Sequence, residues 1–222
     1  MKRDVSWHFE QTYQSHEMPL ESTRMGRPTS SFSVQTIRTL DQLEQVWSFA
    51  ISVLDLPPGK HTLQYYTEQL PKTPTLLVFA EQDDRICGCV LASIEDDHVL
   101  VGPVAVAEDW RRMGIGSAMM REVETRAKEI GQNTLVLGAA EEAEPFYLSC
   151  GFQPNLFIQL PEPGAVERLE AMNEEYDVIW KAEREGWSRL MLRTPGIDKG
   201  LQRKYDQAFP NCSTQYVFTK HV

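Results

Sequence analysis

The sequence has no long hydrophobic run, no excess of basic residues and no closely paired cysteines of the kind that bind zinc. Its longest apolar stretch, Val99 to Ala107, is interrupted by Gly102 and Pro103 and is far shorter than the roughly 20 residues of a membrane-spanning helix. Of the 222 residues, 41% are hydrophobic and 24% are charged, as in ordinary globular domains. This composition excludes collagen-like, coiled-coil and fully disordered chains.

The chain lacks the basic surface that binding to nucleic acid requires. Its formal net charge is −10, from 22 Lys and Arg against 32 Asp and Glu. Residues 32–160 carry nine basic and eighteen acidic groups, so most of the negative charge lies there. An acidic field attracts cations and amines, although a merely solvated acidic surface explains the same count. We therefore expect neither nucleic acid nor membrane as a partner.

The cysteines favour a reducing compartment over a metal site. The four lie at positions 87, 89, 150 and 212, without the paired CxxC or CxxH spacing of zinc sites, and we expect no metal. Cys87 and Cys89 alternate within a predicted strand, so both point to one face as small buried hydrophobic residues. The N-terminal segment shows no apolar signal region, which leads us to expect a cytoplasmic protein.

The pattern along the chain divides it into three segments. Residues 1–31 are a polar arm, in which an alternation of aromatic residues also allows a short strand or docking segment (Trp7, Phe9, Tyr13). Residues 32–160 form a regular core. Residues 161–222 form an extension of the same domain whose last strands complete the sheet. The extension can cover the substrate, form a homodimer surface or simply pack on the sheet.

Hydrophobic periodicity and turn residues predict an alternation of strands and helices. Strands are predicted at 32–37, 75–80, 86–94, 98–106, 134–137, 151–160, 189–193 and 215–219. Helices are predicted at 41–54, 62–70, 115–130, 141–149, 166–186 and 201–209. The first helix is capped by Thr39 or Asp41, and the helix over 166–186 follows apolar residues spaced three or four apart.

A strand, a loop and a helix meet between Val104 and Ser117 in a way that predicts an anion site. The first N–H groups of a helix have no intrahelical partner, and the helix dipole is positive there. Gly114 and Gly116 allow a phosphate to approach the backbone, and two arginines precede them. Two glycines alone indicate only a tight turn, but together with the arginines they favour a pyrophosphate site. The Lys-Ser/Thr ending of a Walker loop and the third glycine of a dinucleotide fingerprint are both absent.

This segment resembles the signature of the GNAT superfamily of acyl-CoA-dependent N-acyltransferases. The family pattern Arg/Gln-x-x-Gly-x-Gly/Ala is matched by Arg111-Arg112-Met113-Gly114-Ile115-Gly116, after a strand ending in Val-Ala-Val. A second family mark, a Tyr shortly before Gly-Phe, is matched by Tyr147 and Gly151-Phe152. The resemblance covers residues 32–160. It implies an α+β fold in which helices flank a mixed, mostly antiparallel sheet, here with a C-terminal α/β extension.

The resemblance also implies which residues hold acetyl-CoA, the expected co-substrate. Backbone groups of the strand would pair with the pantetheine arm, and loop amides would hold the pyrophosphate (Val104, Ala105, Val106, Arg111, Arg112, Met113, Gly114, Ile115, Gly116, Ser117). Tyr147 would be the general acid at the CoA sulfur, although a Tyr packed at a helix end with its hydroxyl on backbone is the alternative. Many members have Asn where this chain has Ala140, so cofactor contacts there must differ.

The implied reaction is direct attack of a primary amine of a small molecule or peptide on acetyl-CoA. A backbone N–H near Val106 would stabilise the oxyanion. The base that deprotonates the amine is left open among seven residues, each of which can equally be a turn or cap residue (Glu95, Asp96, Asp97, His98, Glu141, Glu142, Glu144). The alternatives are another acyl-CoA, a hydroxyl acceptor, a non-catalytic CoA-binding module and a protein-interaction domain.

Overall fold

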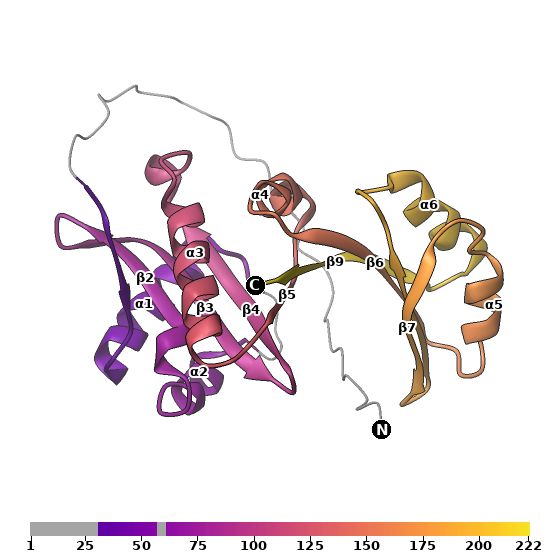
Figure 1. Ribbon diagram of the computed structural model, residues 1–222, viewed down its shortest axis with the longest axis horizontal. Helices are drawn as coiled ribbons and strands as arrows, with labels where there is room; N and C mark the ends of the chain where they lie inside the picture. Colours follow the sequence, from indigo (N-terminus) through magenta and orange to yellow (C-terminus); the bar gives the residue numbers. More distant parts are fainter. Residues whose placement is uncertain (1–30, 57–60) are drawn as a thin grey trace. The chain divides into compact units, whose positions relative to one another are not determined.

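The computed structural model describes residues 31–56 and 61–222, shown in Figure 1. The predicted arm and its aromatic alternation lie outside the described residues, apart from residue 31. The described chain contains nine strands and six α-helices. Its contacts define two compact units, the first ending at Leu135 and also holding Val222, the second spanning 136–221. Strand β5 (Thr134–Gly138) runs from the first unit into the second.

The first unit is built on four antiparallel strands in chain order. These are β1 (Ser33–Thr36), β2 (Leu77–Gln82), β3 (Arg85–Glu95) and β4 (His98–Val106). Asp83 and Asp84 both adopt positive φ, the geometry of the tight hairpin turn predicted at this place. The predicted strand over 98–106 is confirmed with both of its ends.

Three α-helices belong to this unit: α1 (Leu40–Val53), α2 (Leu63–Gln69) and α3 (Ile115–Glu129). The side chain of Thr39 accepts from the Gln42 N–H, and the Gln42 side chain accepts from the Thr39 N–H. Helix α1 therefore begins with a capping box. The Thr62 side chain caps α2 by accepting from the Tyr65 N–H. Their predicted positions are confirmed.

The helices cover both faces of the first sheet. One face packs on α1 and α2 through a buried apolar cluster that includes Leu43, Val46, Tyr66, Cys89 and Leu91. The other face meets α3, which lies across strands β2 to β4 in Figure 1. At Gly88 a Cβ would come within 2.7 Å of the Met119 methyl group on α3 and 3.1 Å of the Ala105 carbonyl oxygen, so the helix packs closely on the strand at this glycine.

Strand β4 contains a bulge. Val104 pairs with Val90 and Val101 pairs with Ala92, so Gly102 and Pro103 together face the single residue Leu91. The inserted residue reverses which side chains point to each face. Before the bulge even-numbered residues share the face of α1 and α2, and after it odd-numbered residues do.

The second unit contributes antiparallel strands in the order β9-β6-β8-β7. Its strands are β6 (Gln153–Leu160), β7 (Asp177–Arg184), β8 (Trp187–Arg193) and β9 (Ser213–His221). Its α-helices are α4 (Glu144–Ser149), α5 (Val166–Ala171) and α6 (Lys199–Ala208). The α5 and α6 helices are joined by the bond from the Tyr205 hydroxyl to the Leu169 carbonyl.

The helix predicted over residues 166–186 is wrong in its second half. Helix α5 ends at Ala171, and residues 177–184 form β7 instead. Glu185 and Gly186 both adopt positive φ and turn the chain directly into β8. The same residues also fit a period of two, with Val178, Trp180 and Ala182 the less exposed ones, and pairing with β8 decides between the two periods.

The predicted fold class is confirmed: this is a mixed α/β protein with mostly antiparallel strands flanked by helices. Cys87 and Cys89 are buried as expected, and burial raises the pKa of the Cys89 thiol to about 12. Within residues 31–56 and 61–222, no helix is long and apolar enough to cross a membrane. No cluster of three potential metal ligands occurs in this same part of the chain.

Candidate active site

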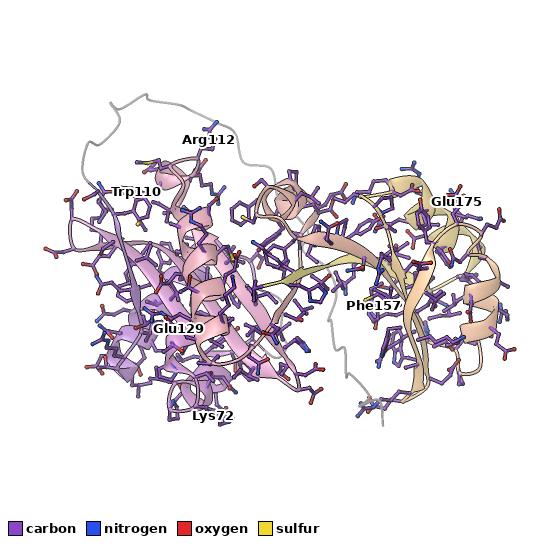
Figure 2. The ribbon with its side chains drawn as sticks, viewed as in Figure 1. Lys72, Trp110, Arg112, Glu129, Phe157 and Glu175 are labelled. Atoms are coloured by element: carbon purple, nitrogen blue, oxygen red, sulfur yellow. The ribbon has the colours of Figure 1, made fainter. Side chains whose placement is uncertain are left out.

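The predicted anion loop joins the end of β4 to the start of α3. The chain leaves β4 at Val106, makes a 3-10 turn over Glu108–Trp110 and enters α3 at Ile115. In Figure 2, Trp110 and Arg112 mark the loop end of α3 and Glu129 marks its opposite end. Gly114 occupies the cap position and supplies no side-chain acceptor, so the first helical N–H groups have no capping side chain. They are placed to bind an anion.

The backbone of this loop is strained at Arg112. Arg112 has a φ of 65° and Gly114 a φ of 84°, both in the left-handed region. For a residue with a side chain such as Arg112 this conformation costs about 1 kcal/mol. Non-glycine residues in this region cluster at binding sites, where the rest of the structure holds them. The Arg111 Nε donates to the Val106 carbonyl at 3.1 Å, which ties the loop back to the end of β4.

The loop has the chemistry and the room that a pyrophosphate needs. Arg111 and Arg112 are exposed and bring two positive charges to the amide cluster. Gly114 is exposed, and a Cβ built on it would meet no atom within 4 Å. A phosphate can therefore reach the backbone, and the donor set fits the diphosphate of CoA.

Within the predicted cofactor set, two side chains point into the protein. Ala105 belongs to the cluster beneath α1, and Ile115 is 1% exposed beside Gly88. These two residues can serve a ligand only through their backbones. The others are partly or fully exposed along β4, in the loop or in the first turn of α3 (Val104, Val106, Arg111, Arg112, Met113, Gly114, Gly116, Ser117). Their contacts with CoA remain predictions.

Tyr147 lies on α4 in the second unit, among aromatic rings. Its ring centroid is 5.1 Å from that of Phe146, 6.0 Å from Phe152 and 5.9 Å from Phe218. The side chain is 6% exposed. Such packing holds a phenol ring in one orientation, which an acid needs and a purely structural Tyr also shows. Ala140, the position where many family members have Asn, directly precedes the 3-10 turn Glu141–Ala143.

The candidate bases fall into three environments. Asp96, Asp97, Glu141 and Glu142 are exposed turn residues. His98 is buried, and burial lowers its pKa, so its ring is neutral at pH 7. The two remaining carboxylates, Glu95 and Glu144, have specific partners.

Glu144 is the most enclosed carboxylate of the second unit. It is 6% exposed, and its Oε1 lies 3.1 Å from the Lys199 Nζ. Burial raises the pKa of Glu144, and Lys199 opposes that rise only in part. A raised carboxyl pKa favours proton transfer, but the lysine also gives Glu144 a structural role as an ion-pair partner.

Glu95 belongs to a polar cluster in the first unit that sequence reasoning missed. The Tyr65 hydroxyl lies 2.7 Å from Glu95 Oε1 and 2.7 Å from Ser93 Oγ. Next to it, His61 Nδ1 lies 2.6 Å from the Tyr66 hydroxyl, and the two rings are stacked. The only sequence signal was Gly102-Pro103 inside a strand, a pair that is typical of a bulge.

Comparison with known proteins identifies the family. Residues 40–152, about half of the chain, match the acetyltransferase (GNAT) family. The protein belongs to the GNAT family. It is therefore an acyltransferase enzyme, as the two sequence marks predicted. No curated protein sequence matches this GNAT protein significantly.

Solved structures share the fold at low sequence identity. A polyamine N-acetyltransferase from Drosophila melanogaster has a TM-score of 0.53 and 12% identity, over 86% of this chain and 100% of that one. A GNAT acetyltransferase from Elizabethkingia anophelis, solved with acetyl-CoA, has a TM-score of 0.47 and 14% identity, over 86% and 98%. The Escherichia coli ribosomal-protein-S18-alanine N-acetyltransferase has 0.48 and 14%, over 76% and 96%. At 12% identity, the likeness to the polyamine N-acetyltransferase shows the fold alone.

Proposed function

We propose that this GNAT protein transfers the acetyl group of acetyl-CoA to a primary amine of a small molecule or peptide by direct attack. The observation that carries the proposal is the strained, exposed Arg-rich loop at the start of α3 in a chain of this family. Acetyl-CoA supplies a thioester, whose carbonyl carbon accepts an amine. The chain's own residues bind the co-substrate, orient it and move protons.

The loop residues hold the diphosphate in this proposal. Amides from Met113 to Ser117 donate hydrogen bonds, and Arg111 and Arg112 neutralise charge. Backbone groups at Val104 and Val106 pair with the pantetheine arm, and a backbone N–H of β4 beside the thioester stabilises negative charge on the carbonyl oxygen. Tyr147 donates its phenolic proton to the leaving sulfur.

The charge of the chain supports an amine as acceptor. Residues 32–160 carry a net charge of −9, while the two arginines of the loop provide a local positive site. A cationic amine is thereby attracted to the molecule, while the anionic co-substrate is bound where the field is reversed. All four cysteines are free thiols and two of them are fully buried, which supports a location in the reducing cytoplasm.

Calorimetry with acetyl-CoA, followed by a thiol-release screen, tests the proposal. The screen covers polyamines, aminoglycosides, amino acids and peptides, with hydroxyl acceptors and longer acyl-CoAs as parallel arms. We expect acetyl-CoA to bind and one class of primary amine to release free thiol. If calorimetry detects no binding of any acyl-CoA, the proposed function is contradicted. Binding without turnover of any acceptor leaves a CoA-binding module, and turnover with hydroxyl acceptors alone corrects the acceptor class.

A further inference from the structure

We propose that His61, positioned by Tyr66, is the base that takes the proton from the acceptor amine. The inference rests on the proposed function and names the residue that completes its proton transfers. It stands on the placement of a histidine–tyrosine pair over the bulge of β4, within the first unit alone.

The pair meets at a single point above Gly102. A Cβ added at Gly102 would lie 2.1 Å from the Tyr66 hydroxyl, 2.8 Å from His61 Cε1 and 2.9 Å from His61 Nδ1. Any side chain there would displace both residues, so the glycine leaves the room that the pair occupies. The bulge and the pair therefore form one feature of the molecule.

Strand geometry places this point at the length of a pantetheine arm from the loop. The arm has twelve bonds from its phosphate ester oxygen to its sulfur, which corresponds to about four residues of extended backbone at three bonds per residue. Arg111 of the loop donates to the carbonyl of Val106, the last residue of β4. Gly102 lies four residues before Val106 on the same strand. An arm running along β4 from the loop thus ends its thioester beside the bulge.

The hydrogen bonds of the pair suit a proton acceptor. Tyr66 is fully buried and its hydroxyl donates to the Leu91 carbonyl at 3.3 Å, opposite the bulge. In the tautomer that this proposal requires, His61 Nδ1–H donates to the hydroxyl oxygen at 2.6 Å and Nε2 carries the lone pair. After Nε2 is protonated, both hydrogen bonds persist, so the charged ring keeps its place.

The surroundings favour a cationic acceptor. Tyr65 stands edge-on to both His61 and Tyr66, and its hydroxyl holds Glu95. Glu95, Asp96 and Asp97 end β3 and form the turn into β4, on the same hairpin as the bulge. An ammonium group is attracted along this hairpin and loses its proton at the histidine.

Nε2 of His61 takes one proton from the ammonium group, and the lone pair left on nitrogen forms the bond to the acyl carbon. The carbon–sulfur bond breaks with its electron pair on sulfur, and Tyr147 of the proposed function gives one proton to that sulfur. The acylated nitrogen then loses its second proton, which restores the Tyr147 phenol, so the net proton released by the reaction is the one held by His61. No oxidant, reductant or metal enters the balance.

Chemical labelling tests the placement without any acceptor. Diethyl pyrocarbonate modifies His61 and the exposed His221, and peptide mass spectrometry follows both rates. At acetyl-CoA tenfold above its Kd, we expect labelling of His61 to slow about tenfold, because the unliganded fraction falls by that factor. 3′-Phospho-ADP, which lacks the arm, should leave the rate at His61 unchanged, and His221 is the internal reference. Equal His61 rates with and without calorimetrically bound acetyl-CoA overturn the inference, whereas absence of binding overturns the proposed function instead.

Kinetics test the base role with the best amine of the thiol-release screen. His61→Gln should lower kcat/KM about a hundredfold or more while the Kd of acetyl-CoA stays the same. In His61→Gly, added imidazole should restore part of the rate. Retention of kcat/KM within about twofold in His61→Gln refutes the base role. In Tyr66→Phe, ¹⁵N shifts of the His61 ring should report a mixed tautomer, which a purely structural Tyr66 would not alter.

Discussion

The two units of the molecule use the same architecture for different purposes. In the first, polar and strained groups gather at two places along β4, the bulge at Gly102 and the loop at Arg112. In the second, several polar groups bind to one another or to the backbone and stabilise the fold. Asp198 caps α6, the Tyr205 hydroxyl donates to the Leu169 carbonyl of α5, and Lys199 pairs with Glu144. Strain in an exposed loop, as at Arg112, is typical of ligand sites, whereas the paired groups of the second unit stabilise the fold.

The comparison implies that substitutions in the first unit change binding and turnover more than they change folding. Substitutions in the second should do the opposite, with Tyr147 as the exception. Four predictions test this division.

The largest effect is expected at Gly114. Gly114→Glu places a carboxylate where the diphosphate should bind, and the positive φ adds about 1 kcal/mol of strain. We expect calorimetry to show loss of acetyl-CoA binding of about a hundredfold or more, because a charge-assisted donor site becomes repulsive. The matched control is Gly131→Glu at the other end of α3, where φ is 76° and the Cβ also meets no atom. Equal affinities of the two variants would show that the loop does not hold the diphosphate.

Tyr147→Phe probes the exception in the second unit. Removal of the proton donor should lower kcat about a hundredfold, at the lower end of general acid catalysis, because a thiolate leaves readily. The aromatic packing is retained, so the Kd of acetyl-CoA and the free energy of unfolding should change little. Tyr205→Phe, which removes another buried hydroxyl of this unit, is the control and should keep full kcat. A wild-type kcat in Tyr147→Phe would show that Tyr147 is not the general acid and serves only in packing.

A smaller effect is expected from the cap of α6. The Asp198 carboxylate accepts from the Leu201 N–H at 2.9 Å, and this bond holds the pKa of Asp198 below its usual value. Asp198→Ala should reduce the free energy of unfolding by about 1 kcal/mol, measured by urea denaturation. Acetyl-CoA affinity should not change.

The pH dependence of the same site has a definite sign. A depressed carboxyl pKa stabilises the fold above the unfolded value and loses that contribution as the pH falls through the folded value. Asp198→Asn keeps a capping oxygen and cannot titrate. The stability advantage of the wild type over Asp198→Asn should therefore vanish in acid below about pH 4. An advantage that grows in acid contradicts the assignment.

The smallest effect concerns Glu144. Because burial raises its pKa, the folded state favours the protonated form, so its contribution is greatest in acid and is lost as the pH rises through the folded pKa. Urea denaturation should show Glu144→Gln gaining stability relative to the wild type as the pH increases. Lys199→Met, which removes the ion-pair partner, should steepen the pH dependence of the wild-type carboxylate. A flat difference between the wild type and Glu144→Gln would mean that Lys199 fully compensates for burial.

Local signals in the sequence were enough to predict most of the fold. Thr39 and Thr62 begin helices where their capping chemistry places them, and β4 spans its apolar run. The error over residues 177–184 arose where two periods fit equally and only pairing with β8 decides. Local periodicity carries no information about such a nonlocal choice.

The site was predictable only where it is contiguous. The loop from Arg111 to Ser117 lies in one stretch of sequence, and so it could be proposed as an anion site from the sequence alone. The cluster of His61, Tyr66 and Gly102 joins α2 to β4 across about forty positions, and single residues of these types are common. Its recognition needed the register of β3 and β4, which no local pattern contains.

The single extra residue in β4 has a consequence for how this enzyme can vary. The bulge reverses the side-chain alternation of β4. Even-numbered residues face α1 and α2 over residues 98–101, and odd-numbered residues face them over residues 104–106. In the proposed function, substitutions before the bulge would change the acceptor site and leave the part of the strand that pairs with CoA unaltered. A one-residue deletion at the bulge would reverse the side-chain alternation of one part of the strand relative to the other. Gly102-Pro103 would then be the boundary that lets acceptor choice vary independently of CoA binding.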